Sequence, residues 1–472
     1  MVVAQPVLPM EGSLPPDLQG TLFRVGPRST GRPRMVPSHG GSEDAGGDET
    51  GGDETGEHLL PGALHAVEIR DCAAVSYLSR ESEADAGVFW HAGSLLALPE
   101  TGLPLRYTQQ LQAQEFGGGL KVPIASHTHR IASDGCRVLF SVEDRSATDA
   151  EGVDAGGDGD ETDAETLDEG LWLLIGEWDA AGAFRTAQAV RLERATWQHD
   201  IAVTDGHVVF IESPTRSVPG LAAAVPFGWV PGAEGWVGVA ERGGDGTVRW
   251  FRYDPSLVTH VLGAWEEPAD RAPGGADTDI VLYVCRYEAP EEGQPVDLAA
   301  SVVGPEGIGL VPIGDSLAVL ERWRLHGDRL ERTQVDDRRV EYPRMDAVCE
   351  GGPFRFGYCV ETSWATGGAV SDSGVGHPGL LQFDLQRGEV ASWTPGPGRT
   401  ASEPIFVRAR DGHSDDEGWL LSVVDDPDRG ASDLYVLDAS TFGRHRPEAI
   451  IHLPERLPFR SHGEWVPADR YR

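Results

Sequence analysis

Short apolar runs, broken again and again by aspartate and glycine, are the feature that most constrains how this chain can fold. Runs of this kind between turn residues are typical of β-strands, and no stretch carries a long helical period. Turn sequences at 204–206 and 244–246 lie between paired runs, as in β-hairpins. The expected strands are residues 138–142, 171–179, 201–203, 208–212, 236–242, 248–253, 280–287, 317–325, 354–362, 380–385, 419–424 and 434–438. We therefore predict an all-β protein whose helices are few and short.

So many strands in one chain must close on themselves or stack, because exposed sheet edges invite aggregation. A β-propeller achieves this by setting four-stranded blades radially around a channel. The sequence contains no sharp internal repeat, so it does not by itself set a blade count. We expect a single domain over residues 1–472, since large all-β folds often run long. Two acidic, glycine-rich stretches at about 40–57 and 149–169 are expected to be surface insertions, because they cannot bury enough apolar area to order themselves.

The charge of the chain is strongly negative. It has 39 basic and 76 acidic residues, a net charge of −37, and Lys121 is its only lysine. Such a surface repels phosphate backbones, which excludes nucleic acid as a partner. It also keeps a protein hydrated when salt screens its self-repulsion, so we interpret it as halophilic adaptation. A few acidic tails on an ordinary protein are the alternative, although the chain stays acidic without the two stretches named above.

The cysteines and the first residues favour a cytoplasmic protein. Five scattered cysteines, without a CxxC pair, argue against a disulfide framework. The first residues have neither the basic start nor the apolar core of a signal peptide, and no apolar run reaches about 20 residues. The sequence leaves the oligomeric state open.

Four histidines, His127, His199, His260 and His462, stand in or beside strand-like runs. Their separations (199 − 127 = 72, 260 − 199 = 61, 462 − 260 = 202) are too wide for a zinc finger or a HExxH helix. A metal shared by these side chains would need a fold that returns repeatedly to one axis. Any one of the 15 histidines is more often a surface or core side chain than a ligand. The neighbouring sequence is what singles these four out.

Six segments support a family resemblance by their content and order. They are GTLFRVGP (20–27), LHAVEIRD (64–71), HDIAVTDGHVVFIESP (199–214), VEYPRMD (340–346), SEPIFV (402–407) and SHGEW (461–465). Together they resemble the carotenoid cleavage oxygenase family, which includes stilbene-cleaving enzymes and a retinoid isomerase. The resemblance implies a seven-bladed β-propeller with a short helical or loop cap over the metal-bearing face. It also implies a nonheme Fe(II) dioxygenase that uses dioxygen as co-substrate and cleaves one C=C bond of a carotenoid or apocarotenoid to two carbonyl products.

By this resemblance, the four histidines hold the iron, and imidazole suits iron among several metals. His127 competes for the first position with His129, since on a strand both side chains would point to the same face. His127 is preferred because Gly135 follows it at the spacing that the family shows.

The resemblance also assigns outer carboxylates, which orient ligand rings and partly offset the charge of the metal. Glu341 and Glu403 are each expected to accept a hydrogen bond from the far nitrogen of a ligand histidine. A third family glutamate corresponds to His91, in the segment FWHAGSLLAL. A neutral imidazole carries no compensating charge, so the ligand beside His91 is expected to be held less firmly.

The implied partner is a lipophilic polyene, selected by a long apolar tunnel. The uncharged stretch 217–229 is expected either to make peripheral membrane contact, as related segments do in the family, or to be a buried loop. Three alternatives stay open for the function: polyene isomerisation on the same iron, cleavage of a stilbene or other phenylpropenoid, and a noncatalytic binding propeller. The phenylpropenoid branch of the family uses a Tyr and a Lys to activate a phenol, and Lys121 is the only lysine available.

Overall fold

Nearly all regular structure is β-strand, which confirms the all-β prediction. The structure is a computed structural model that describes residues 2–27, 62–99, 102–115, 124–125, 127–144, 170–194, 196–217, 227–230, 232–269, 278–289, 303–304, 307–308, 317–364, 375–444, 446–457 and 462–471. Within these ranges the helices are two 3-10 turns, η2 (Ala347–Cys349) and η3 (Ala468–Tyr471). No helix among the described residues has the length and apolar character that crossing a bilayer requires. The two acidic stretches at about 40–57 and 149–169 that were expected to be insertions, and most of 217–229, lie outside these residues.

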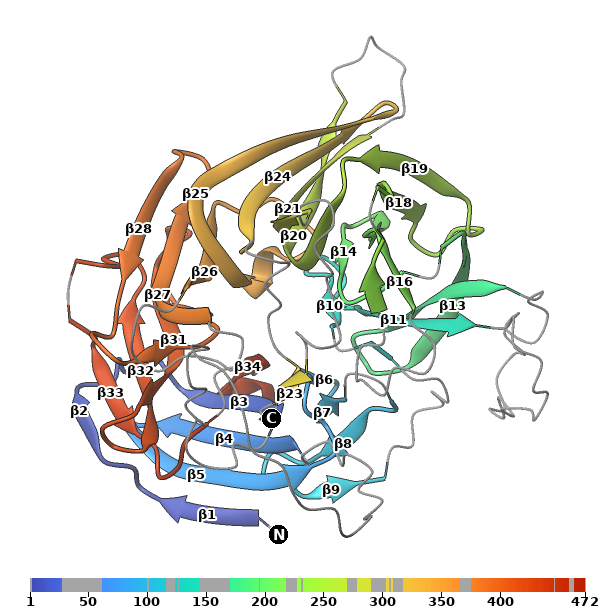
Figure 1. The fold of residues 1–472 in the computed structure, drawn as a ribbon. Helices are drawn as coiled ribbons and strands as arrows, with labels where there is room; N and C mark the ends of the chain where they lie inside the picture. The colour runs from blue at the N-terminus through green and yellow to red at the C-terminus, as the bar shows by residue number, and fades with distance from the viewer. Residues whose placement is uncertain are drawn as a thin grey trace, which may run out of the picture.

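Six larger antiparallel sheets make up the fold (Figure 1). The first has the order β1 (Val2–Pro6), β5 (Ala73–Ser82), β4 (Gly62–Arg70), β3 (Gly20–Pro27), β34 (His462–Pro467). The second is β6 (Gly87–His91), β7 (Ser94–Leu98), β8 (Leu105–Tyr107), β9 (Ala113–Gln114). The third is β10 (His129–Arg130), β11 (Arg137–Asp144), β12 (Leu171–Trp178), β13 (Phe184–Leu192). The fourth is β14 (Ile201–Val203), β15 (His207–Glu212), β18 (Gly235–Glu241), β19 (Val248–Tyr253).

The fifth sheet is the longest, because one strand joins two groups of strands. Its order is β20 (Ser256–Pro268), β21 (Thr278–Glu288), β24 (Val319–His326), β25 (Arg329–Met345), β26 (Phe356–Trp364), β27 (Val375–Asp384), β28 (Glu389–Trp393). The sixth is β2 (Met10–Gly12), β33 (Ala449–His452), β32 (Ala431–Asp438), β31 (Gly418–Asp426), β29 (Thr400–Ala401), with β30 (Ile405–Arg408) also pairing β31. Two small pairs complete the described strands: β16 (Thr215–Ser217) with β17 (Phe227–Trp229), and β22 (Val303–Gly304) with β23 (Gly307–Ile308).

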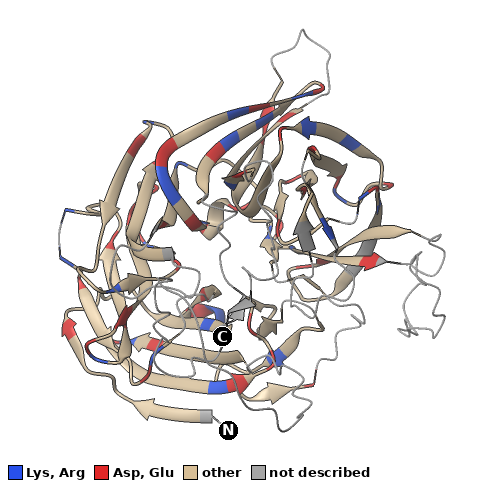
Figure 2. Cartoon of the chain, viewed as in Figure 1, with Lys and Arg blue, Asp and Glu red and all other residues tan. Residues whose placement is uncertain are grey.

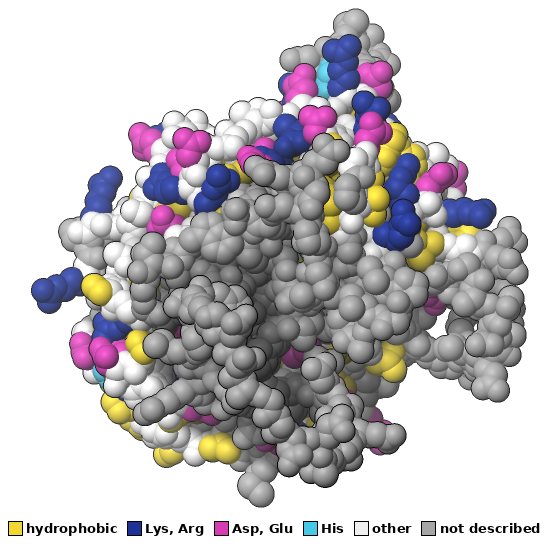
Figure 3. Space-filling view, viewed as in Figure 1, with side chains coloured by type: hydrophobic (Ala, Val, Ile, Leu, Met, Phe, Trp, Pro, Cys, Tyr) yellow, Lys and Arg dark blue, Asp and Glu magenta, His cyan; other side chains and the backbone are white. Residues whose placement is uncertain are grey.

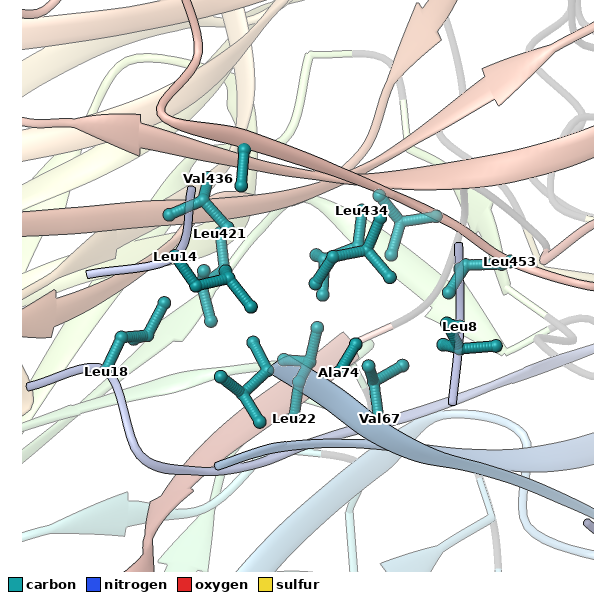
Figure 4. Packing of buried hydrophobic residues seen from close by; sticks show 14 of the residues in the cluster. Leu8, Leu14, Leu18, Leu22, Val67, Ala74, Leu421, Leu434, Val436 and Leu453 are labelled. Atoms are coloured by element: carbon teal, nitrogen blue, oxygen red, sulfur yellow. The ribbon is translucent and has the colours of Figure 1, made fainter. Parts of the chain in front are cut away.

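Buried apolar clusters join each group of strands to the next one along the chain. Phe140 of β11 packs in one cluster with Phe210 of β15, for example, and Val239 of β18 packs in another with Trp323 of β24. A further cluster joins the first sheet to the sixth, through residues such as Leu22 and Leu434 (Figure 4). The sheets therefore follow one another around a common centre (Figure 1). The strands at the inward edges of the sheets can therefore bring their side chains together at this centre.

Close packing between neighbouring strands explains one glycine in the fourth sheet. Gly238 of β18 lies opposite Phe210 of β15, and a Cβ at Gly238 would stand 2.2 Å from Cζ of that ring. The aromatic ring occupies the place of the missing side chain, so the fully buried Phe210 can lie flat against the sheet.

Both ends of the described chain are paired with strands from the opposite end. β34 pairs with β3, with Val25 opposite His462, and β2 pairs with β33. These two pairings tie the first and sixth sheets together. The pairing of β34 with β3 also places His462 at the inward edge of the first sheet. The position of one predicted ligand thus depends on pairing between residues more than 430 apart in sequence, at Val25 and His462 (462 − 25 = 437).

Charged side chains of both signs lie along β25 and over one face of the molecule. Figure 2 shows acidic and basic residues alternating along β25, and Figure 3 shows both signs interspersed over the described part of one face. At the turn between β24 and β25, Asp328 and Arg329 are 97% and 82% exposed. The basic residues of this acidic chain therefore sit among carboxylates that partly neutralise them.

A chain of polar contacts, buried at His65 and Tyr77, also links the first sheet to the C-terminal segment. Nδ1 of His65 lies 2.7 Å from the Tyr77 hydroxyl, and that hydroxyl donates to Glu455 at 2.7 Å. Burial lowers the pKa of His65 from 6.5 to about 4, with the Glu455 carboxylate opposing the shift. His65 is therefore neutral in the folded protein at neutral pH.

Acidification is expected to destabilise the metal-free protein partly through His65. Its folded pKa lies below its unfolded pKa, so the unfolded chain binds the extra proton, and stability falls as the pH drops from about 6.5 to about 4. The loss from this one group is roughly 3 kcal/mol in free energy of unfolding. Denaturant unfolding of His65→Gln should show a smaller loss between pH 7 and pH 4.5 than the parent chain. The exposed His413→Gln serves as control and should behave like the parent, whereas an unchanged pH dependence in His65→Gln would contradict this assignment.

Candidate metal centre

The four predicted histidines stand at inward edge strands of four different sheets. His127 and His199 lie just before β10 and β14, His260 lies in β20, and His462 begins β34. Each of these strands is the last one on its side of a sheet, so its side chains can meet those of other sheets at the centre. The structure thus brings together residues that are 61 or more positions apart (260 − 199 = 61).

The four imidazole rings form one cluster. Ring centroids are 4.6 Å apart for His127 and His199, 4.7 Å for His127 and His462, and 5.1 Å for His199 and His260. Nε2 of His199 lies 3.2 Å from Nε2 of His127 and 3.3 Å from Nε2 of His260. His462 approaches His260 with a centroid distance of 5.5 Å. The rings meet edge to face, and the nitrogen atoms of His127, His199 and His260 are turned toward one another.

This donor set fits a divalent transition metal. Two imidazole nitrogens that bind one ion at about 2.1 Å and at a right angle are about 3.0 Å apart, close to the spacing seen here. Nitrogens of His127, His199 and His260 all lie within 4.8 Å of one another. Burial, followed by the neighbouring imidazoles, lowers the pKa of His127 well below 6.5, so its ring is a neutral donor. Imidazole alone does not choose among iron, zinc, copper and nickel.

Glu341 orients His260 from behind. Its side chain is fully buried in β25, and its Oε2 lies 2.7 Å from Nδ1 of His260. Oε1 accepts hydrogen bonds from the Thr259 and Tyr287 hydroxyls, both at 2.6 Å. Burial alone would raise the pKa of Glu341, but His260 and the two hydroxyls lower it, so the carboxylate stays ionised. Burial would lower the pKa of His260, but Glu341 raises it. When the ring is neutral, its Nδ1–H donates to Glu341 and the lone pair of Nε2 faces the cluster.

Glu403 orients the ring of His462 in the same way, but two arginines lie beside this carboxylate. Its Oε1 lies 2.8 Å from Nδ1 of His462, and its Oε2 accepts from the Gly463 amide at 2.9 Å. Two arginines flank it, Arg344 at 2.9 Å and the buried Arg24 at 3.6 Å. Burial would raise the pKa of Glu403, but Arg344, His462 and Arg24 hold it far below its usual range. Part of its charge is therefore already neutralised, unlike that of Glu341.

Aromatic rings cover the cluster on two sides. The Trp197 ring lies 4.6 Å from the His199 ring, and Tyr342 lies 5.6 Å from His260 and 5.5 Å from His462. Tyr342 has a φ of 52°, a left-handed conformation that non-glycine residues rarely adopt. Strain of this kind is held only where surrounding contacts fix it, and here it directs Glu341 and Tyr342 to the same cluster.

The structure places His127, and not His129, in the cluster of rings. The two side chains do not share a strand, because β10 begins only at His129 and residue 127 lies before it. His129 instead lies between two carboxylates, with Asp200 Oδ1 2.8 Å from Nε2 and Glu350 Oε1 3.0 Å from Nδ1. Burial would lower the pKa of His129, but Asp200 and Glu350 raise it to about 10.

His91 does not join the cluster, which corrects the prediction that it would stand behind a ligand. It ends β6 and is turned toward the third sheet, where its Nε2 lies 2.7 Å from the Asp179 carbonyl oxygen. Its ring stacks on Trp178 at 6.0 Å. Burial, followed by Arg137, lowers its pKa, so it is a neutral donor to that carbonyl. In this position the His91 side chain connects the second sheet to the third.

A cavity of about 100 Å³ opens beside the rings. Its lining includes His127, His260 and His462, together with polar side chains such as Arg344 and Glu350. A space of this size and polarity suits water or dioxygen and is too small for a polyene.

Several residues that shape the site were not singled out from the sequence. They are Arg24, His129 in this role, Asp200, Thr259, Tyr287, Arg344 and Glu350. A signal was available for four of them, since Asp200 directly follows His199 and Thr259 directly precedes His260, while Arg24 and Arg344 lie in the segments GTLFRVGP and VEYPRMD. Tyr287 and Glu350 are far in sequence from their partners, and only the packing of sheets brings them there.

Comparison with known proteins gives consistent matches. The model of the protein family described as retinal pigment epithelial membrane protein matches residues 54–467. A Mycobacterium tuberculosis protein named carotenoid cleavage oxygenase is 30% identical over 250 residues, which cover 52% of this chain and 44% of that protein. Isoeugenol monooxygenase from Pseudomonas putida is 27% identical over 401 residues, covering 81% of this chain and 74% of the relative. The match thus spans less than half the length of the Mycobacterium protein.

Solved structures support the same fold. The crystal structure of Pseudomonas brassicacearum lignostilbene dioxygenase has a TM-score of 0.75 and 21% sequence identity, and the alignment covers 99% of this chain and 96% of that one. At this level of identity, the likeness bears on the all-β architecture alone.

Proposed function

The chain belongs to the carotenoid cleavage oxygenase family, whose model carries the description retinal pigment epithelial membrane protein, and from that membership we propose that it is a nonheme Fe(II) dioxygenase. The proposed substrate is a carotenoid or apocarotenoid. In the reaction, one C=C bond and the O=O bond break, two C=O bonds form, and the two halves of the polyene leave as carbonyl products. The observation that carries the proposal is the meeting of four imidazole rings from four sheets.

His127, His199, His260 and His462 are the proposed ligands. Ferrous iron bound by them would supply the redox chemistry that activates dioxygen for attack on the double bond. The protein's residues contribute position: Glu341 and Glu403 fix the orientation of two rings. The apolar tunnel that selects one bond of a polyene is part of the proposal, as is peripheral membrane contact through 217–229.

We also propose a seven-bladed propeller that spans the chain as one domain, with acidic insertions at about 40–57 and 149–169. Support comes from the fifth sheet, which divides at the register shift within β25 into two four-stranded groups. Counting those groups separately gives seven units in sequence. The cap expected over the metal-bearing face remains a prediction, as do halophilic adaptation and a cytoplasmic location.

A phenylpropenoid is the second candidate substrate. The observation that favours it is the match to an isoeugenol monooxygenase, which extends over 81% of this chain. Activation of a phenol by a lysine would fall to Lys121, which lies outside the described residues. Polyene isomerisation on the same iron and a noncatalytic binding role are the further alternatives that product analysis separates.

The test is anaerobic Fe(II) loading, followed by incubation with β-carotene, an apocarotenal or a phenolic stilbene under ¹⁸O₂, with products identified by mass. We expect two carbonyl fragments from a polyene, each labelled with one ¹⁸O before exchange with water, and no product from metal-free protein. Fragments from the stilbene alone would favour the second candidate. Polyene products of unchanged mass would indicate isomerisation, and no turnover of any substrate by iron-loaded protein would contradict an enzymatic role.

A further inference from the structure

Asp200 contacts three of the segments that carry the clustered histidines. It directly follows His199, and its Oδ1 also accepts from the Ile201 amide at 2.9 Å. Its Oδ2 accepts from the amide of Val261, the neighbour of His260, at 2.8 Å. Its Oδ1 is 2.8 Å from Nε2 of His129, two residues beyond His127. One buried carboxylate thus links residues of the third, fourth and fifth sheets.

His129 extends this link to a fourth element. Its other ring nitrogen, Nδ1, lies 3.0 Å from Glu350, directly after η2. The backbone adds a second tie between the same two segments, since the Ala132 amide donates to the Glu350 carbonyl at 3.0 Å. The side chains of Asp200 and His129 are 4% and 15% exposed, so water competes little for these contacts.

We propose that Asp200 and His129 are positioning residues that set the spacing of His127, His199 and His260, and so the affinity and coordination geometry for the metal. The inference rests on the proposed metal site and adds to it. Glu341 and Glu403 each orient one ring, whereas the Asp200–His129 pair holds three ligand segments from different sheets relative to one another. A ligand set preorganised in this way binds metal without first having to draw the sheets together.

The test compares Asp200→Asn and His129→Asn with a matched control, Asp433→Asn. Asp433 is also buried and pairs with His452 at 2.8 Å, but it lies in β32, opposite His452 of β33, in the sixth sheet. Metal-free proteins are titrated with Co(II), whose visible absorption reports coordination geometry, and their thermal unfolding is measured separately. We expect both site variants to bind Co(II) about 10- to 100-fold more weakly, with an altered spectrum. Asp433→Asn should keep the parent affinity and spectrum, even if its unfolding temperature falls.

The double variant adds a second readout. If the two residues act as one link, Asp200→Asn with His129→Asn should cost little more affinity than either single change. Parent affinity and spectrum in folded Asp200→Asn and His129→Asn would overturn the link, and His129→Asn alone decides the matter should Asp200→Asn fail to fold. If the parent chain itself bound no Co(II), the proposed metal site would fall and the link with it. Binding by the parent with unaffected variants would overturn the link only.

Discussion

His199→Ala is expected to reduce metal affinity by at least about 100-fold and to abolish oxygen-dependent cleavage. His199 is the ring with nitrogen contacts to two others, at 3.2 Å to His127 and 3.3 Å to His260. Loss of a direct ligand should exceed the 10- to 100-fold effect that is typical of outer partners. Iron content after anaerobic loading and desalting measures the change.

The matched control for this prediction is His207→Ala. His207 stands in β15 of the same sheet and bonds to Glu266 at 2.9 Å, outside the ring cluster. It should retain the iron content of the parent chain. Full iron content and turnover in His199→Ala would show that this imidazole is not a ligand.

Glu341→Gln is expected to have the second largest effect, because it acts on both metal binding and folding. The amide keeps the shape of the side chain but removes the charge that faces His260. Its NH₂ group can also face the Thr259 or Tyr287 hydroxyl, where the carboxylate accepted a hydrogen bond. We expect about 10- to 100-fold weaker metal binding and roughly 3 kcal/mol less stability, as for a broken buried polar network.

Glu361→Gln is the control for the loss of one carboxylate. Glu361 lies across from Val340 in the neighbouring strand β26 and is only partly buried. Metal titration and denaturant unfolding of both variants separate the effect of losing one carboxylate charge from the effect of losing the contact with His260. Equal, small effects at the two positions would show that Glu341 has no special relation to the ring.

The sequence predicted the strands best where apolar runs end in clear turns. Residues 201–203 and 248–253 form strands with those bounds, and the turns at 204–206 and 244–246 join paired strands as expected. The long strand β25 was not among the expected strands. Its first half is charged and exposed, and Pro343 interrupts the pattern near its end. A strand with a charged outward face lacks the apolar run from which strands are predicted. Its order comes from pairing with its neighbours.

At the site, sequence reasoning found residues with distinctive neighbours and misplaced those whose role depends on backbone direction. His199, His260 and His462 lie in characteristic segments, and their rings meet. His91 was misplaced, because a side chain at the end of β6 can turn toward either adjacent sheet. Asp200 was overlooked, because its partners Val261 and His129 come from other sheets and share no local pattern with it.

The most direct test of the account is an anomalous diffraction measurement at the iron absorption edge, on crystals grown anaerobically with Fe(II). The account predicts one strong peak about 2.2 Å from the Nε2 atoms of His127, His199, His260 and His462. No peak among these rings, or a peak held by other residues, would contradict it.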